Sequence, residues 1–272
     1  SSSVTISSND IKMMPVENIH QVINLQAGVV GGHFRGGRSN EVAYLIDGIS
    51  VTDVFNGGMS VEVENSSIRQ MEVISGTFNA EYGQAMSGIV NIVTKDGGSK
   101  YEGSVSAYVG SYLSNRSDFF PNLNKINTDG PKDVQFNFGG PTKLVDNLTF
   151  FVTGRYYKDD GYLYGKRVFN TSDDRPIFPN PQDPTFYINR NTGDGEYVPM
   201  NPGDKLSLNG KISYSLENWR FSYSIFWDDN WNKSYNHAYR QTPDAIKNHY
   251  RTNTINNIQI SFYPTQSTYS TL

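Results

Sequence analysis

Strict alternation of apolar and polar side chains in the second half of the sequence is the feature that most constrains the fold. It is clearest in residues 219–227 (WRFSYSIFW) and recurs in residues 205–216 (KLSLNGKISYSL) and 147–157 (NLTFFVTGRYY). Successive side chains of a β-strand point to opposite faces, so each segment is predicted to be a strand with one apolar face. In the first segment that face carries Trp219, Phe221, Tyr223, Ile225 and Trp227, and Phe226 is the exception on the other face.

The connections between the predicted strands alternate in length. Weaker alternation near residues 101–112, 132–140 and 249–263 brings the number of strands to about six, with the start of a seventh at 267–272. The connections at 113–131, 159–204 and 230–248 are long, whereas those at 141–146 and 217–218 are short. Strands of about 9–11 residues with alternating short and long connections are typical of outer-membrane barrels. The sequence therefore predicts antiparallel transmembrane β-barrel strands.

Composition excludes several classes of protein. Hydrophobic residues make up 36% and aromatic residues 13%, with 18 Tyr and 15 Phe, which suits aromatic anchors at a membrane interface. The net charge of −4 argues against a nucleic-acid surface, and the lack of Cys excludes disulfides and thiolate metal sites. The first ten residues have no signal-peptide pattern, so we expect Ser1 to be a mature or trimmed end.

Residues 1–97 have a different pattern, which predicts a small α+β domain. Ser7 or Ser8 is a plausible cap for a short first helix, and Gly28 is placed to end a second helix that carries Ile19, Val22, Ile23 and Gln26 at helical spacing. Short strands are expected at 33–35, 42–46, 69–74 and 89–94, separated by glycines. The predicted division is a domain of residues 1–97 followed by membrane strands in residues 98–272.

A cationic loop precedes one of these strands. In residues 35–48 (RGGRSNEVAYLIDG), Arg35 and Arg38 surround two glycines, and the strand that follows ends in an Asp-Gly turn. An RGG sequence also occurs in RNA-binding repeats, but here it occurs once in an acidic chain. Because a guanidinium group binds carboxylates and phosphates in pairs, the loop is consistent with an anionic ligand.

Three stretches resemble TonB-dependent outer-membrane receptors. Two of them match the plug domain of that family, FRGGRSNEVAYLIDGISV (34–51) and SIRQMEVISGTFNAEYGQAMSGIVNIVTKDGG (67–98), and DDGYLYGKRVFNTSD (159–173) matches an external loop. The likeness is to the Oar-like branch common in Bacteroidota-type bacteria. The resemblance implies a plug domain at 1–97 inside a barrel of about 22 strands, of which residues 98–272 supply about six.

The resemblance also implies site residues. Arg35 and Arg38 are expected at the plug apex, facing the ligand chamber beneath the loop at 159–204; alternatively, Arg35 bonds turn carbonyls or a barrel carboxylate. Asp53 and Phe55 are expected in the next apical loop, or else as a capping Asp and a packed Phe.

Plug–barrel contacts are implied in the same way. Arg69, Glu72 and Glu81 match the positions at which the family pairs the plug with the barrel wall. In a water-filled lumen each such pair is worth about 0–1 kcal/mol.

The implied function is energised import across the bacterial outer membrane. A ligand binds at the external loops and the plug apex, and a TonB-type protein pulls a segment that we expect N-terminal to this chain. The membrane strands contact lipid and lipopolysaccharide. Because an open sheet edge in lipid is not viable, we expect a longer polypeptide or other chains to complete the barrel.

Catalytic and metal sites are not indicated. The four His residues lack metal-ligand spacing, and neither Asp159-Asp160 nor Asp173-Asp174 begins a calcium-binding loop. We therefore predict a protein that is not an enzyme and has no cofactor. Two alternatives stay open: a non-transporting or secretion-linked barrel or adhesin, and, more remotely, a soluble carbohydrate-binding or carbohydrate-cleaving β protein, whose cleaving form would need paired carboxylates.

Overall fold

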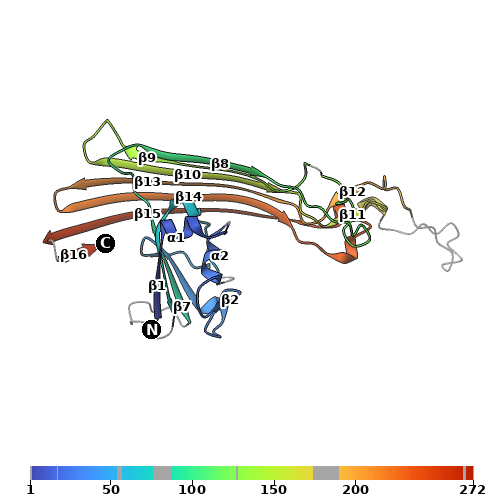
Figure 1. Ribbon diagram of the computed structural model, residues 1–272, viewed down its shortest axis with the longest axis horizontal. Coiled ribbons are helices and arrows are strands. Elements are labelled where there is room, and N and C mark those ends of the chain that lie inside the picture. The colour runs from blue at the N-terminus through green and yellow to red at the C-terminus, as the bar shows by residue number, and fades with distance from the viewer. Residues whose placement is uncertain are drawn as a thin grey trace.

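The computed structural model consists of a small mixed domain packed on one side of a long antiparallel sheet (Figure 1). It describes residues 2–16, 18–53, 57–75, 87–126, 128–173, 190–265 and 268–271. We call the small domain the plug and the long sheet the wall. None of the helices in these ranges is long and apolar enough to cross a membrane.

The wall is an open sheet of seven strands in the order β16-β15-β14-β13-β10-β9-β8. Its strands are β8 (Glu102–Val109), β9 (Lys132–Pro141), β10 (Leu148–Asp159), β13 (Gly203–Leu216), β14 (Trp219–Lys233), β15 (Asn248–Thr265) and β16 (Thr268–Thr271). Every neighbouring pair is antiparallel. The predicted antiparallel strands are confirmed.

The short and long connections lie at opposite ends of the wall. Residues 217–218 form a two-residue turn in which Glu217 adopts a left-handed φ of 47°. At the other end, the connection between β10 and β13 contains a small two-stranded sheet of β11 (Tyr164–Lys166) and β12 (Tyr197–Pro199) (Figure 1). By the pattern of outer-membrane barrels, the end with β11 and β12 is the external end.

The side chains of β14 alternate between the two faces of the wall, as predicted. Trp219 and Tyr223 are 43% and 41% exposed on the outer face, whereas Ser224 and Phe226 are 2% and 3% exposed on the face toward the plug. Phe226, the exception in the sequence pattern, packs into the apolar core of the plug. On β13 the apolar side chains of Leu206, Leu208 and Ile212 are likewise exposed on the outer face.

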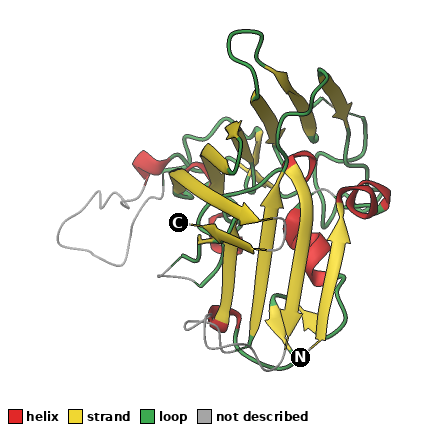
Figure 2. Ribbon diagram, turned by 90° about the vertical axis from the view of Figure 1, so that its left-hand side faces the viewer, coloured by secondary structure: helices red, strands yellow, loops and turns green. Residues whose placement is uncertain are grey.

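The plug is built on a five-stranded sheet in the order β1-β6-β7-β4-β5. Its elements are β1 (Ser2–Ser7), α1 (Ser8–Met13), α2 (Ile19–Asn24), β4 (Val42–Ile46), β5 (Ile49–Ser50), β6 (Ile68–Ser75) and β7 (Gly88–Thr94). A separate pair of β2 (Val29–Val30) and β3 (His33–Phe34) and short 3₁₀ turns at Ser39–Glu41 (η1) and Asn65–Ser67 (η2) complete it. Figure 2 shows the molecule end-on, with the N-terminus on the side of the plug away from the wall.

Two local predictions in the plug needed correction. The strand β1 was not expected, although it buries Ile6 and pairs with β6 along its whole length. The second helix ends at Asn24, before the expected Gln26, because Gln26 N–H bonds the carbonyl of Ile23 in a tighter final turn. The first helix is capped by Ser7, as predicted.

The facing of β14 predicts an alternating response to lipid-soluble probes. Single spin labels at positions 223 and 225 of the full-length receptor in bilayers should collide readily with oxygen, because these positions face outward. Labels at 222 and 224 should be protected, because they lie between the wall and the plug. Power-saturation measurements along the strand test this, and equal accessibility at all four positions would contradict the assigned register.

Candidate functional site

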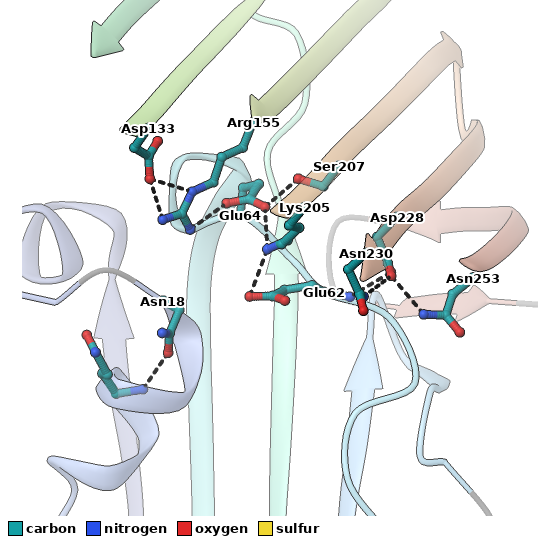
Figure 3. Close-up of polar contacts among 11 residues, drawn as sticks. Asn18, Glu62, Glu64, Asp133, Arg155, Lys205, Ser207, Asp228, Asn230 and Asn253 are labelled. Carbon is teal, nitrogen blue, oxygen red and sulfur yellow. Dashed lines mark hydrogen bonds and ion pairs between the residues drawn. The ribbon is translucent and has the colours of Figure 1, made fainter. Parts of the chain in front are cut away.

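The candidate site is the interface at which the plug contacts the inner face of the wall. Its centre is Glu64, the residue before η2, which is 3% exposed (Figure 3). Glu64 Oε2 lies 3.3 Å from Arg155 Nη1 on β10. Arg155 is held from the other side by Asp133 on β9, with Nη2 and Nε at 2.5 and 2.8 Å from Asp133 Oδ2. The guanidinium therefore bridges a carboxylate of the wall and a carboxylate of the plug.

The second carboxylate oxygen of Glu64 also accepts hydrogen bonds from the wall. Glu64 Oε1 accepts hydrogen bonds from Ser207 Oγ at 2.5 Å and Lys205 Nζ at 3.1 Å, both on β13. Lys205 Nζ also lies 2.9 Å from Glu62 Oε1. Burial alone would raise the pKa of the Glu64 carboxyl, but Lys205 and Arg155 outweigh it and hold this pKa below its usual range. Glu64 is therefore a buried carboxylate that stays ionised.

A second cluster lies nearer the short-turn end, around Asp96. Lys211 Nζ on β13 is 3.2 Å from both Asp47 Oδ2 and Asp96 Oδ1. Arg220 Nη2 on β14 is 2.7 Å from Asp96 Oδ1, and Ser213 Oγ donates to the same carboxylate at 3.0 Å. Burial raises the pKa of Asp96, but Lys211 and Arg220 lower it more, so that this carboxyl too has a pKa below its usual range.

A third group of contacts lies toward the external end. Arg251 on β15 donates from Nη2 to the carbonyl of Ser60 at 2.7 Å and lies 3.7 Å from Asp53 Oδ2. On β14, Asp228 accepts the Glu62 backbone N–H at 3.3 Å and the Asn253 side-chain amide at 2.8 Å. Backbone groups of the plug thus contribute to the interface beside its carboxylates.

The ion pairs between plug and wall among the described residues all have the same polarity. The plug supplies the carboxylates and the wall supplies the cations. The plug members are Asp47, Asp53, Glu62, Glu64 and Asp96, and the wall members are Arg155, Lys205, Lys211, Arg220 and Arg251. These ion pairs favour one position of the plug relative to the wall. If the plug moved along the wall, buried charges would lose their partners, and each broken buried pair costs about 3–5 kcal/mol.

The cationic loop of the sequence lies on the plug between β3 and β4. Arg35 has a left-handed φ of 47°, its N–H bonds the carbonyl of Gly28 at 2.8 Å, and its side chain packs over Gly28. The Arg38 N–H donates to Glu41 Oε2 at 3.0 Å, while the Arg38 side chain is exposed. In Figure 1 the neighbouring strand β2 lies on the side of the plug that faces the external end.

Asp53 and Phe55 were predicted in the next apical loop. Gly57, two residues after Phe55, lies on Asn40 next to the cationic loop, with no room for a Cβ atom. Asp53 is directed to Arg251 of the wall at 3.7 Å. Phe55 lies outside the described residues.

Two of the three residues expected to pair with the wall, Arg69 and Glu72, lie in the described part of the chain and have contacts of a different kind. Arg69 lies 3.8 Å from Asp96, the plug carboxylate that binds Lys211 and Arg220, so it joins the interface indirectly. Glu72 accepts a hydrogen bond from Ser3 Oγ at 2.7 Å within the plug. Glu81 lies outside the described residues. Their direct contact with a barrel wall stays a prediction, since the seven-stranded wall here is open.

The carboxylates at the centre of the interface were not among the residues predicted from the sequence. Arg155, Lys205 and Lys211 stand out as charges on the polar face of alternating strands, which is a usable signal for an inner wall. Glu64 and Asp96 have no such signal, because they lie in irregular segments beside η2 and after β7. In the part of the chain that the structure describes, no group of three or more His, Asp or Glu residues is placed to hold a metal ion.

Comparisons with known proteins agree with this architecture. Residues 1–90 match the family model described as TonB-dependent Receptor Plug Domain. The TonB-dependent transporter Oar of Myxococcus xanthus is 30% identical over 129 residues, which are 44% of this chain and 12% of Oar. The vitamin B12 transporter BtuB of Vibrio vulnificus is 27% identical over 130 residues, 43% of this chain and 22% of BtuB.

Solved structures show the same fold. The siderophore receptor PirA from Pseudomonas aeruginosa superposes with a TM-score of 0.58 at 20% identity over 95% of this chain and 37% of PirA. A mutant ferric enterobactin receptor from the same species, in complex with enterobactin, gives 0.60 at 16% identity over 96% of this chain and 38% of the receptor.

The chain thus spans less than a quarter of the length of the curated relatives it matches. Oar is the branch that the sequence resemblance indicated, but the source organisms of these proteins give no support for a Bacteroidota origin. TonB-dependent receptors are non-enzymatic transporters of the bacterial outer membrane. Residues 1–90 belong to the family of TonB-dependent receptor plug domains, and the chain as a whole has the fold of the plug and part of the barrel of such receptors.

Proposed function

We propose that the receptor imports a ligand through its plugged barrel and that a TonB-type protein supplies the energy. The observation that carries this proposal is the polar interface between plug and wall. Among the described residues, Phe226 is the one buried apolar wall residue in the plug core, and the partly buried Ile255 packs against that core. Ion pairs and hydrogen bonds make up much of the rest of the interface. Water can replace contacts of this kind as the plug moves, whereas a large apolar interface would resist opening.

The plug is proposed to end at Gly97 and the barrel to begin at Gly98. Gly97 packs against the backbone of Phe150 and Gly140, so a Cβ atom at this position would collide with the wall. This position lies directly after Asp96, which ties the end of the plug to Lys211 and Arg220. A fixed exit point of this kind lets the N-terminal part of the plug move while the chain stays attached to the wall.

A bacterial uptake experiment tests the function. Medium components would be measured before and after growth of the wild-type source bacterium, a receptor deletion strain and a TonB deletion strain. The proposal expects at least one component that the wild type depletes and that both deletion strains leave. Depletion that needs neither protein would contradict it and favour a surface-binding or secretion-linked barrel.

The ligand is proposed to be anionic and to bind the plug apex near Arg35, Arg38, Asp53 and Phe55. Support comes from the exposed Arg38 side chain and from the contact of Gly57 with Asn40 next to the cationic loop. Asp53 contributes on the wall side of the apex through its contact with Arg251.

Replacing both arginines by glutamine should weaken binding of the imported component. Each lost charge-assisted hydrogen bond costs about 1.5–3 kcal/mol, roughly tenfold to a hundredfold in affinity. The measurement is a binding titration on purified full-length receptor. The control is the Lys12→Gln/Lys100→Gln variant, which removes two exposed cations, one in α1 and one between β7 and β8. If the R35Q/R38Q receptor assembles correctly and binds with unchanged affinity, the arginines do not bind the ligand. If this variant does not assemble, the arginines serve the fold.

A further inference from the structure

The described parts of the three long connections at the external end are joined to one another by hydrogen bonds and ion pairs. The connections at 160–202 and 234–247 share backbone hydrogen bonds, Lys166 N to Arg240 O at 2.9 Å and Val168 N to Gln241 O at 3.0 Å. Arg167 links the two connections by ion pairs. Its Nε lies 2.5 Å from Asp244 Oδ2, and its Nη1 lies 2.6 Å from Asp194 Oδ2.

The connection at 110–131 is joined to the one at 160–202. Asp160 N–H bonds the carbonyl of Asp129 at 3.1 Å, and Tyr112 donates its hydroxyl to Asp159 at 2.7 Å. The ring of Tyr162 contacts the rings of Tyr112 and Phe120, with centroids 5.4 and 6.4 Å apart. Because hydrogen bonds, ion pairs and ring contacts join the three connections to one another, a space between them has a defined shape.

Such a space lies between the three connections and has a volume of about 600 Å³. This volume is within the usual range for small-molecule sites. Aromatic side chains from all three connections line this outer-loop cavity: Phe119, Phe120, Tyr164, Tyr197 and Tyr235. Aromatic faces in this number favour a ligand with a flat ring, which stacks against them.

The lining of the cavity also includes two cations, Lys166 and Arg240, that form no ion pair with a carboxylate of the described residues. Lys166, Arg240 and His237 line it together with one carboxylate, Asp118, which lies 3.8 Å from Arg116. In the described ranges no carboxylate lies within ion-pair distance of Lys166 or Arg240, and neither cation lies over an aromatic ring. The adjacent Arg167, in contrast, has two carboxylate partners.

We propose that the outer-loop cavity binds an aromatic carboxylate, whose ring stacks on the tyrosine and phenylalanine side chains while Lys166 and Arg240 bind its carboxylate group. The site is separate from the plug apex, and it captures such a ligand, or the aromatic acid portion of a larger one, before the ligand reaches the plug. Binding here needs neither TonB nor plug movement, so the site can be tested independently of transport.

Two matched probes test this site, naphthalene-2-carboxylate and its neutral amide. Binding to full-length receptor in lipid nanodiscs would be followed by saturation-transfer NMR, with empty nanodiscs as the blank. The carboxylate should bind, and Lys166→Gln/Arg240→Gln should weaken it about tenfold or more while leaving the amide unchanged. Phe119→Ala/Tyr197→Ala should weaken both probes, because it removes stacking surface.

The control is Lys125→Gln/Lys247→Gln, which removes two exposed loop charges outside the cavity and should bind both probes as the wild type does. Unaltered binding of the amide by K166Q/R240Q shows that the cavity itself is intact. The proposal is overturned if naphthalene-2-carboxylate does not bind above the blank, or if K166Q/R240Q binds it as tightly as the control variant.

Discussion

The arrangement of plug and wall depends on the buried contact of Glu64 with Arg155 and Lys205. These three side chains come from a plug turn and two wall strands, and they meet because β10 and β13 have one specific register. A shift of one residue in any of these strands would turn its charged side chain to the lipid face and its apolar side chains to the plug. The charge contacts and the apolar outer face are therefore two consequences of the same register.

The uniform polarity of the interface has a consequence for movement of the plug. When the plug shifts, its carboxylates leave a row of cations on the inner wall, from Arg220 near the short turns to Arg251 toward the external end. Once the plug has moved away from the wall, water can reach these groups, so each broken pair can be hydrated instead of staying buried. The same contacts that define the resting position can thus be exchanged for water when the N-terminal part is pulled.

Most of the architecture could be predicted from the sequence, because the responsible signals are local. Alternation in β13 and β14 gives both the strands and their facing, and Ser7 gives the start of the first helix. The strand β1 could not be found in this way, since its six residues are stabilised by pairing with β6, which is almost 70 residues away. Glu64 and Asp96 were missed for the same reason, because their importance comes from wall side chains distant in sequence.

The most direct test of the account is a double-mutant cycle between Glu64 and Lys205. Glu64→Gln, Lys205→Gln and the double variant would be compared in the full-length receptor by amide hydrogen exchange of β6 and β7, which gives the free energy of plug opening. A buried interfacial charge pair predicts a coupling of about 1.5 kcal/mol or more, whereas Glu72→Gln with Lys205→Gln, which have no shared partner, should be additive within about 0.5 kcal/mol. A coupling near zero for Glu64 and Lys205 would contradict the claim that this contact seats the plug against the wall.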